Sequence, residues 1–318
     1  MTIASVCLRW SRIVRNTPRY WSLLVIRDRF SARKVKDALN MAKGHLEKVK
    51  LYNLSANDLI RLGRFFRHVS PAVKTLYYET RECSSIIALA SLGLKPESLI
   101  VRNEDPRGPP ICAVYGALMS ILDPTLRRLS LHRSSYTFIN WRRFAPLLRH
   151  LTHLTVTGSG FADLRLLNYI TTIEEIILDF KDEFFGQDES QITHTDISLP
   201  SLRVFKLRHV LCPTAMGLPT VGFCAPMLRT FHLESTSAAL WLLAFSDHGA
   251  PAAPVDFRVD QPNGLAVELS HLQPFLCDTI ESFALTSISH ELDPLLSDIE
   301  AGLILPRRKH LEFTFHDE

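Results

Sequence analysis

The sequence predicts an α/β solenoid in which short parallel strands alternate with connecting helices. Three observations point to this fold: an apolar spacing that recurs along the chain, prolines placed before several of its copies, and helical periodicity between them. The spacing apolar-x-x-apolar-x-apolar occurs ten times, and an eleventh, less clear run has Arg308 in the first place; the runs recur at intervals of 22 to 30 residues. Repetition at such a period is typical of stacked repeats, in which each unit buries its apolar face only against its neighbours.

Each run is expected to form a short strand. Its last two apolar side chains point into the core, while the residues between and beside them face solvent. The first and last residues of the eleven runs are Leu46 to Leu51, Val73 to Tyr78, Pro96 to Val101, Leu126 to Leu131, Leu151 to Val156, Ile173 to Leu178, Leu202 to Leu207, Leu228 to Leu233, Pro254 to Val259, Ile280 to Leu285 and Arg308 to Phe313. The strands are therefore expected to pair in parallel, in chain order.

The segments between the runs indicate connecting helices. Residues 56–69 place Leu59, Leu62 and Phe66 at helical spacing, with Ser55 available as an N-cap. Further helices are expected at 84–94, 111–122, 141–150 and 163–170. Proline stands two residues before several runs and stops each helix before the next strand, because it cannot continue a helix. An ordinary doubly wound sheet is the alternative, but it does not require a constant motif.

The recurring spacing resembles the L-x-x-L-x-L motif of leucine-rich repeats. In a regular repeat, asparagine or cysteine follows three residues after the last motif position. Here that position holds other residues, such as Leu54, Arg81 and Ser134. The resemblance therefore implies an irregular leucine-rich-repeat-like solenoid of parallel strands with connecting helices, and we assign residues 31–318 to it.

Composition allows the predicted fold, and the lack of catalytic motifs argues against an enzyme. The chain has 318 residues and is 46% hydrophobic, which is enough for a large core. Its six cysteines are scattered without a C-x-x-C pair, which indicates a reducing compartment and neither a disulfide framework nor a zinc site. The sequence lacks the P-loop, G-x-G-x-x-G and G-x-S-x-G motifs. We expect no cofactor, no metal and no membrane span, and a cytoplasmic or nuclear location.

Charge is concentrated near the N-terminus. Residues 1–50 hold 12 Lys and Arg against 3 acids, although the net charge of the whole chain is only +3. A basic end could bind nucleic acid. However, the arginines between residues 9 and 19 have the spacing of the solvated side of an amphipathic helix, and no nucleic-acid motif accompanies them. A nucleic-acid-binding module is therefore the third functional alternative.

The same N-terminal segment carries a second resemblance. Val6-Cys7-Leu8-Arg9-Trp10, then Ile13-Val14, then Thr17 to Leu24 resemble the latter half of an F-box, whose pattern is V-C-x-x-W, an aliphatic pair, and P-x-L-W. Tyr20 stands where that family usually has leucine. Combined with the repeats, this resembles the F-box and leucine-rich-repeat proteins that are abundant in mushroom-forming fungi. We assign residues 1–30 to a partial, helical F-box-like segment.

The resemblance implies a protein-interaction receptor that acts as the substrate-recognition subunit of an SCF-type cullin–RING ubiquitin ligase. Its F-box would bind the Skp-type adaptor through Ile3, Val6, Cys7, Trp10 and Trp21. The family's first F-box helix has no counterpart here, so we expect adaptor binding to be weak or lost. The alternative is a leucine-rich-repeat scaffold with no ligase role, in which the N-terminal helix caps the open end of the repeat stack.

The concave face of the predicted sheet is the expected surface for an unidentified protein target. Its basic, aromatic and histidine side chains are Lys48, Lys50, Tyr52, Tyr77, Arg102, Arg128, His132, His153, Lys206, Arg208 and His232. The early part of this series is basic and aromatic. That composition suits an acidic or phosphorylated segment, since Arg and Lys pair strongly with such groups.

Overall fold

The computed structural model places two compact units along the chain, residues 1–135 (unit 1) and 136–318 (unit 2). The residues that it describes are 16–42, 44–69, 73–82, 85–86, 88–103, 125–135, 149–159, 170–180, 195–209, 221–234, 242, 245, 253–260, 272–276, 278–287 and 293–315. Statements about structure below concern these residues.

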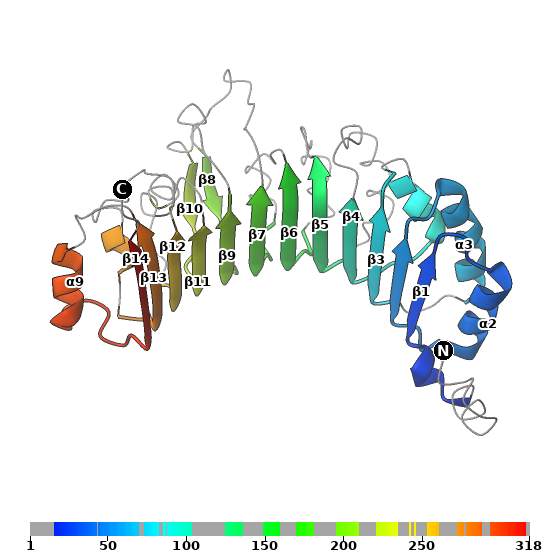
Figure 1. The fold of residues 1–318 in the computed structure, drawn as a ribbon, viewed down its shortest axis with the longest axis horizontal. Coiled ribbons are helices and arrows are strands. Elements are labelled where there is room, and N and C mark those ends of the chain that lie inside the picture. Colours follow the sequence, from blue (N-terminus) through cyan, green and yellow to red (C-terminus); the bar gives the residue numbers. More distant parts are fainter. Residues whose placement is uncertain are drawn as a thin grey trace, which may run out of the picture. The chain divides into compact units, whose positions relative to one another are not determined.

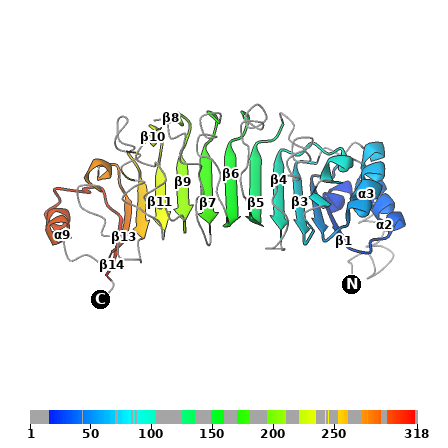
Figure 2. The same ribbon diagram turned by 90° about the horizontal axis from the view of Figure 1, so that it is seen from above.

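Within each unit, short strands form a parallel sheet in which each strand follows its predecessor in chain order (Figures 1 and 2). In unit 1 they are β1 (Leu23–Arg27), β2 (Lys48–Tyr52), β3 (Thr75–Thr80), β4 (Ser98–Asn103) and β5 (Arg128–Ser135). In unit 2 they are β6 (His153–Ser159), β7 (Glu175–Phe180), β9 (Val204–Arg208), β11 (Thr230–Glu234), β12 (Asp256–Asp260), β13 (Ser282–Ser287) and β14 (His310–Phe315). All eleven predicted runs are strands, and the solenoid-like order is confirmed.

The sheet begins one strand earlier than predicted. Strand β1 pairs in parallel with β2, so that Leu24 lies beside Val49 and Ile26 beside Leu51. This strand lies inside the range 1–30 that the sequence analysis assigned to the F-box-like segment. Trp21, Leu24 and Ile26 have the same apolar-x-x-apolar-x-apolar spacing as the other runs, which explains why the chain forms a further repeat here.

In unit 1 the first inner position of each strand is aliphatic. The first motif strand position runs in register through Leu24, Val49, Leu76, Leu99 and Leu129. Of these, the four from Val49 onward are at most 2% exposed. Helices α2 (Ala32–Ala42) and α3 (Ala56–Val69) connect the first three strands. Both helices lie beside β1 to β3 in both views (Figures 1 and 2). The side of the sheet on which these buried motif residues lie is called the inner face.

Helix α3 follows the prediction for residues 56–69. Ser55 is its N-cap, because its hydroxyl accepts the backbone N–H of Asp58 at 3.2 Å and donates to the carboxylate of Asp58 at 2.8 Å. Leu59, Leu62 and Phe66 are buried. Of the helix expected at 84–94, Ser85 and Ile86 are helical, and Ala88–Leu92 form a short 3-10 turn, η3. Residues 84 and 87 lie outside the described residues. The helix expected at 111–122, and most of those expected at 141–150 and 163–170, lie outside the described residues.

Unit 2 has an aromatic core. Phe205, Phe231, Phe257 and Phe283 occupy the first motif position of four adjacent strands, with ring centroids 5.7 to 5.9 Å apart. All four are fully buried. Such tilted and offset contacts are favourable beyond the area they bury. The remaining elements of unit 2 are a second, two-stranded sheet of β8 (Thr195–Ser198) and β10 (Val221–Cys224), the 3-10 turn η10 (Gln273–Phe275) and α9 (Asp293–Glu300).

One backbone feature recurs at the start of the strands in both units. The carbonyl of Glu47 accepts the N–H groups of Lys74 and Thr75 at 2.8 and 3.0 Å, and the carbonyl of Arg229 likewise accepts Val255 and Asp256 at 2.7 and 2.9 Å. Each strand is therefore attached to its predecessor before the motif begins. Over the described part of the chain, no helix is long and apolar enough to cross a bilayer.

Candidate functional site

The side of the sheet opposite the inner face, called the outer face, carries the polar side chains that alternate with the motif residues. The outer face of unit 1 is partly or fully exposed at every position. In strand order its residues are Leu23, Val25, Arg27, Lys48, Lys50, Tyr52, Thr75, Tyr77, Glu79, Ser98, Ile100, Arg102, Arg128, Ser130 and His132. Strand register thus brings together the residues that the sequence analysis chose from β2 to β5.

Two tyrosines form the centre of this face. The rings of Tyr52 on β2 and Tyr77 on β3 lie with centroids 5.5 Å apart and planes tilted by 45°. The guanidinium of Arg27 lies over the Tyr52 ring at 5.5 Å, and the ammonium of Lys50 lies over the Tyr77 ring at 5.9 Å. These cation–π contacts hold two basic side chains against the aromatic surface while leaving their charges on the outer face.

Tyr77 also links two charged neighbours. Its hydroxyl donates a hydrogen bond to the carboxylate of Glu79. Burial, together with the hydrogen bond and charge of Glu79, raises the pKa of Tyr77 to about 12, although Arg102 opposes this shift. Tyr77 is therefore neutral at physiological pH. The pKa of His132 is lowered by burial and by the charge of Arg102, so that Arg102 carries its charge beside a neutral imidazole.

The outer face of unit 1 is strongly basic. Five basic side chains face outward together with a single carboxylate, that of Glu79. The five are Arg27, Lys48, Lys50, Arg102 and Arg128. Within the described ranges, none of the five forms an ion pair with a carboxylate. A surface with this excess of cations attracts anionic partners and speeds their association.

The outer face of unit 2 has the opposite balance. It carries six carboxylates against three Lys and Arg side chains. The acids are Glu175, Asp179, Glu234, Asp256, Asp260 and Glu312, and the bases are Lys206, Arg208 and Arg258. Any anion that approaches this face therefore meets more negative than positive side chains.

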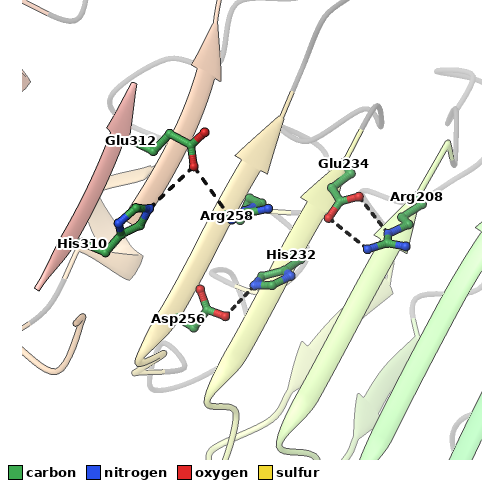
Figure 3. Close-up of polar contacts among 7 residues, drawn as sticks. All are labelled: Arg208, His232, Glu234, Asp256, Arg258, His310 and Glu312. Atoms are coloured by element: carbon green, nitrogen blue, oxygen red, sulfur yellow. Dashed lines mark hydrogen bonds and ion pairs between the residues drawn. The ribbon is translucent and has the colours of Figure 1, made fainter. Parts of the chain in front are cut away.

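Some of these charges contact each other between strands, either on adjacent strands or on strands separated by one other strand (Figure 3). Arg208 Nε lies 2.8 Å from Glu234 Oε2, and Arg258 Nη2 lies 4.0 Å from Glu312 Oε2. Exposed pairs of this kind contribute little to stability. They do, however, reduce the charge that each basic side chain offers to a ligand.

His232 is the most buried polar residue of this face, with 8% exposure. Its Nε2 lies 2.8 Å from Asp256 Oδ2. Burial lowers the pKa of His232, with smaller contributions from Lys206 and Arg258, and Asp256 partly offsets the effect. A neutral imidazole that donates Nε2–H to Asp256 agrees with this direction. His232 is thus held by Asp256, which the sequence analysis did not identify as its partner.

The structure places the predicted target-binding residues in two groups. Those from β2 to β5 lie together on the outer face of unit 1, whereas His153, Lys206, Arg208 and His232 lie on that of unit 2. Three outward residues of unit 1 were missed, namely Leu23, Val25 and Arg27, because β1 was not recognised as a strand. Glu79 was also missed. It lies beside Arg102 on the preceding strand, so the alternation of residues along β3 could have identified it.

Of the predicted adaptor-binding residues, Ile3, Val6, Cys7 and Trp10 lie outside the described residues. Trp21 is half-buried at the end of the 3-10 turn η2 (Pro18–Trp21), directly before β1. The neighbouring Tyr20 is 63% exposed. Among the residues that the structure describes, no group of three or more His, Cys, Asp and Glu side chains could hold a metal ion. No protein-family model matches the chain, and no curated protein matches its sequence.

Proposed function

We propose that this protein is a protein-interaction receptor whose outer face on unit 1 binds an anionic segment of a protein partner. One observation carries the proposal. Five basic side chains and two tyrosines share this face with one carboxylate, and none of the five pairs with a carboxylate within the described ranges. Arg and Lys form strong charge-assisted hydrogen bonds with carboxylates and phosphates.

The comparison with unit 2 supports this choice of surface. On unit 2, Arg208 contacts a carboxylate of the adjacent strand, and Arg258 contacts one on the second strand along. His232 is buried against Asp256. A ligand would have to compete with these contacts and with an excess of acids. An anionic segment would therefore gain more from the outer face of unit 1 than from that of unit 2.

The test measures binding of a fluorescein-labelled peptide of alternating glutamate and serine by fluorescence anisotropy. We expect binding that weakens as salt rises, because the attraction is between exposed charges. The double substitution Arg102→Glu with Arg128→Glu should lower the affinity about ten-fold or more, since like charges across an interface are strongly unfavourable. Its thermal unfolding should change little, because Arg128 is exposed and Arg102 is half-exposed.

A matched control has the same change in net charge on unit 2. Arg203→Glu with Arg229→Glu alters two exposed arginines that lie just before β9 and β11. Binding of the acidic peptide should be unaffected by this pair of changes. If both double variants weaken binding equally, the peptide responds to net charge only, and unit 1 holds no specific surface.

A narrower role within this proposal is substrate recognition for an SCF-type cullin–RING ubiquitin ligase. Its support is the resemblance of residues 6–24 to the latter half of an F-box. A pull-down of the full chain with a purified Skp-type adaptor tests it, and we expect weak, sub-stoichiometric binding that is lost in Trp10→Ala. Complete absence of binding at high concentration would favour a repeat scaffold with no ligase role.

A further inference from the structure

We propose that the ligand of unit 1 is an extended acidic peptide that carries one apolar side chain beside its carboxylates. The apolar side chain would pack on Leu23 and Val25 of β1, and the carboxylates would lie over β2 to β5. This inference rests on the proposed function and adds the chemical pattern of the partner segment.

The edge strand β1 exposes aliphatic surface next to the basic side chains. Leu23 is 47% exposed and Val25 is 46% exposed. In register, Leu23 lies beside Lys48 and Val25 lies beside Lys50. Of the six large apolar side chains that are exposed among the described residues, three lie between Tyr20 and Val25. Apolar surface that clusters in this way beside charged residues is typical of an interaction site.

The spacing of the strands sets the pattern of the peptide. Neighbouring strands lie about 4.8 Å apart, so that Lys50 is one spacing from Val25 and Arg102 on β4 is three spacings, roughly 14 Å, away. An extended peptide that crosses the strands advances about 3.3 Å per residue. A carboxylate one or two positions from the apolar residue would therefore reach Lys50, and one about four positions away would reach Arg102.

The distribution of the cations favours several carboxylates over one phosphate group. Lys48 and Lys50 lie on β2, Arg102 on β4 and Arg128 on β5, so they do not converge on one point. Separate single charges along a chain match this arrangement, whereas a phosphate is best bound where several donors meet.

The aromatic contacts favour a peptide over a single-stranded nucleic acid. Nucleic-acid platforms stack successive bases on the faces of aromatic rings. Here Arg27 and Lys50 already lie over the rings of Tyr52 and Tyr77. The aliphatic surface of Leu23 and Val25 also offers nothing to a base or a phosphate, but it suits a leucine-like side chain.

The experiment compares three labelled peptides of equal charge. The first has a leucine with glutamates two and four positions away, the second has serine in place of that leucine, and the third has the leucine eight positions from the nearest glutamate. We expect the first to bind about five- to ten-fold more tightly than the other two, as for partial burial of a leucine side chain.

Two variants separate this inference from the proposed function. Leu23→Ser with Val25→Ser should remove the advantage of the first peptide and leave binding of the second unchanged. Ile60→Ser is the matched control, because Ile60 is 43% exposed on α3, away from this face, and it should leave all three affinities unchanged. Circular dichroism and thermal unfolding check that each variant is folded.

The outcomes are distinct. If all three peptides bind equally, or if the leucine advantage survives Leu23→Ser with Val25→Ser, the apolar contact is wrong while the proposed function stands. If no peptide binds, both fail. Tighter binding of a singly phosphorylated, otherwise uncharged peptide, or of single-stranded RNA, would overturn the inference in favour of that ligand.

Discussion

Units 1 and 2 are built from the same strand repeat, yet they place aromatic and charged side chains in opposite ways. In unit 1 the first inner position of each strand is aliphatic, and Tyr52 and Tyr77 lie on the outer face among basic residues. Tyr78 is the buried aromatic residue among the described inner strand positions of this unit. In unit 2 the inner face is a series of packed phenylalanines, and the outer face is rich in acids that contact neighbouring bases. The repeat therefore fixes where a side chain points but not its chemistry.

This difference shows which positions are constrained by folding. The inner motif positions must be apolar and well packed, because each strand buries its motif residues only against neighbouring repeats. Leucine in unit 1 and phenylalanine in unit 2 both satisfy that demand. The outer positions face solvent, so their composition can serve binding. On the basic, tyrosine-containing face of unit 1, none of the five basic side chains forms an ion pair with a carboxylate within the described ranges.

The largest effect is expected from truncating an inner aromatic residue of unit 2. Phe231 is fully buried, and its ring centroid lies 4.9 to 5.9 Å from those of Phe205, Phe245, Phe257 and Phe275. Phe231→Ala should lower the free energy of unfolding by about 3–5 kcal/mol, through lost burial and the cavity that remains. Urea-induced unfolding followed by circular dichroism measures the change.

The matched aromatic truncation in unit 1 is Tyr52→Ala. Tyr52 is half-exposed and contacts Arg27 and Tyr77 on the outer face. Its removal should cost about 1 kcal/mol or less, as expected when one cation–π contact and one ring contact are lost at a partly exposed site. Equal losses for Phe231→Ala and Tyr52→Ala would contradict the distinction between inner and outer aromatic residues.

An effect between those of Phe231→Ala and Tyr52→Ala is expected at the helical side of unit 1. Gly63 lies inside α3, where glycine is about 1 kcal/mol less favourable than alanine. A Cβ atom at this position would lie 1.9 Å from the carbonyl oxygen of Ser91 in η3. Gly63→Ala must therefore displace the backbone of η3. We expect a net destabilisation of about 1–3 kcal/mol, as in other overpacked sites.

The control for Gly63 is an exposed residue of the same helix. Asn57→Ala should change the free energy of unfolding by no more than about 0.5 kcal/mol, because Asn57 is exposed in the first turn. If Gly63→Ala stabilises the protein instead, helix propensity outweighs the close approach, and the helices of unit 1 are less tightly packed than the structure indicates.

The sequence predicted the strands of the repeats because the spacing of the apolar residues follows directly from which strand residues are buried. In each run from Leu46 to Phe313, alternate strand residues must be buried. This requirement produces the spacing, and it can be recognised within the few residues of a single run. The helix at 56–69 was equally predictable, from the helical spacing of Leu59, Leu62 and Phe66 and from the N-cap residue Ser55. Strand β1 was missed because Trp21, Leu24 and Ile26 were attributed to the F-box resemblance instead of to a further repeat.

The sequence predicted which residues lie on the outer face better than it predicted the contacts between them. Alternation identified Tyr52, Tyr77 and Arg102 as outward residues. It could not show that Arg27 lies over Tyr52, or that His232 is held by Asp256, because these contacts depend on the register between strands 24 or more residues apart in sequence. Helix α2 was also missed, although Val35, Leu39 and Ala42 have helical spacing and are buried.

The smallest expected effect is on the pH dependence of stability, to which one histidine in each unit contributes in different surroundings. The folded-state pKa values of His132 in unit 1 and His232 in unit 2 are both lowered, first by burial. Below an ordinary histidine pKa of about 6.5, the unfolded chain therefore binds protons more readily than the folded protein. Stability should be unaffected by these groups above that pH, and it should fall as the pH drops from about 6.5 through the folded-state values.

Nuclear magnetic resonance titration of the two imidazoles tests this directly, and neighbouring substitutions should shift them in opposite directions. Arg102→Gln removes the cation that lowers the pKa of His132, so its midpoint should rise toward 6.5. Asp256→Asn removes the carboxylate that favours protonated His232, so its midpoint should fall further. Midpoints at or above 6.5 in the unmodified protein would contradict the burial of these side chains. If the two substitutions shift the midpoints equally and in the same direction, the surroundings of the two histidines do not differ as the structure indicates, with a cation beside His132 and a carboxylate beside His232.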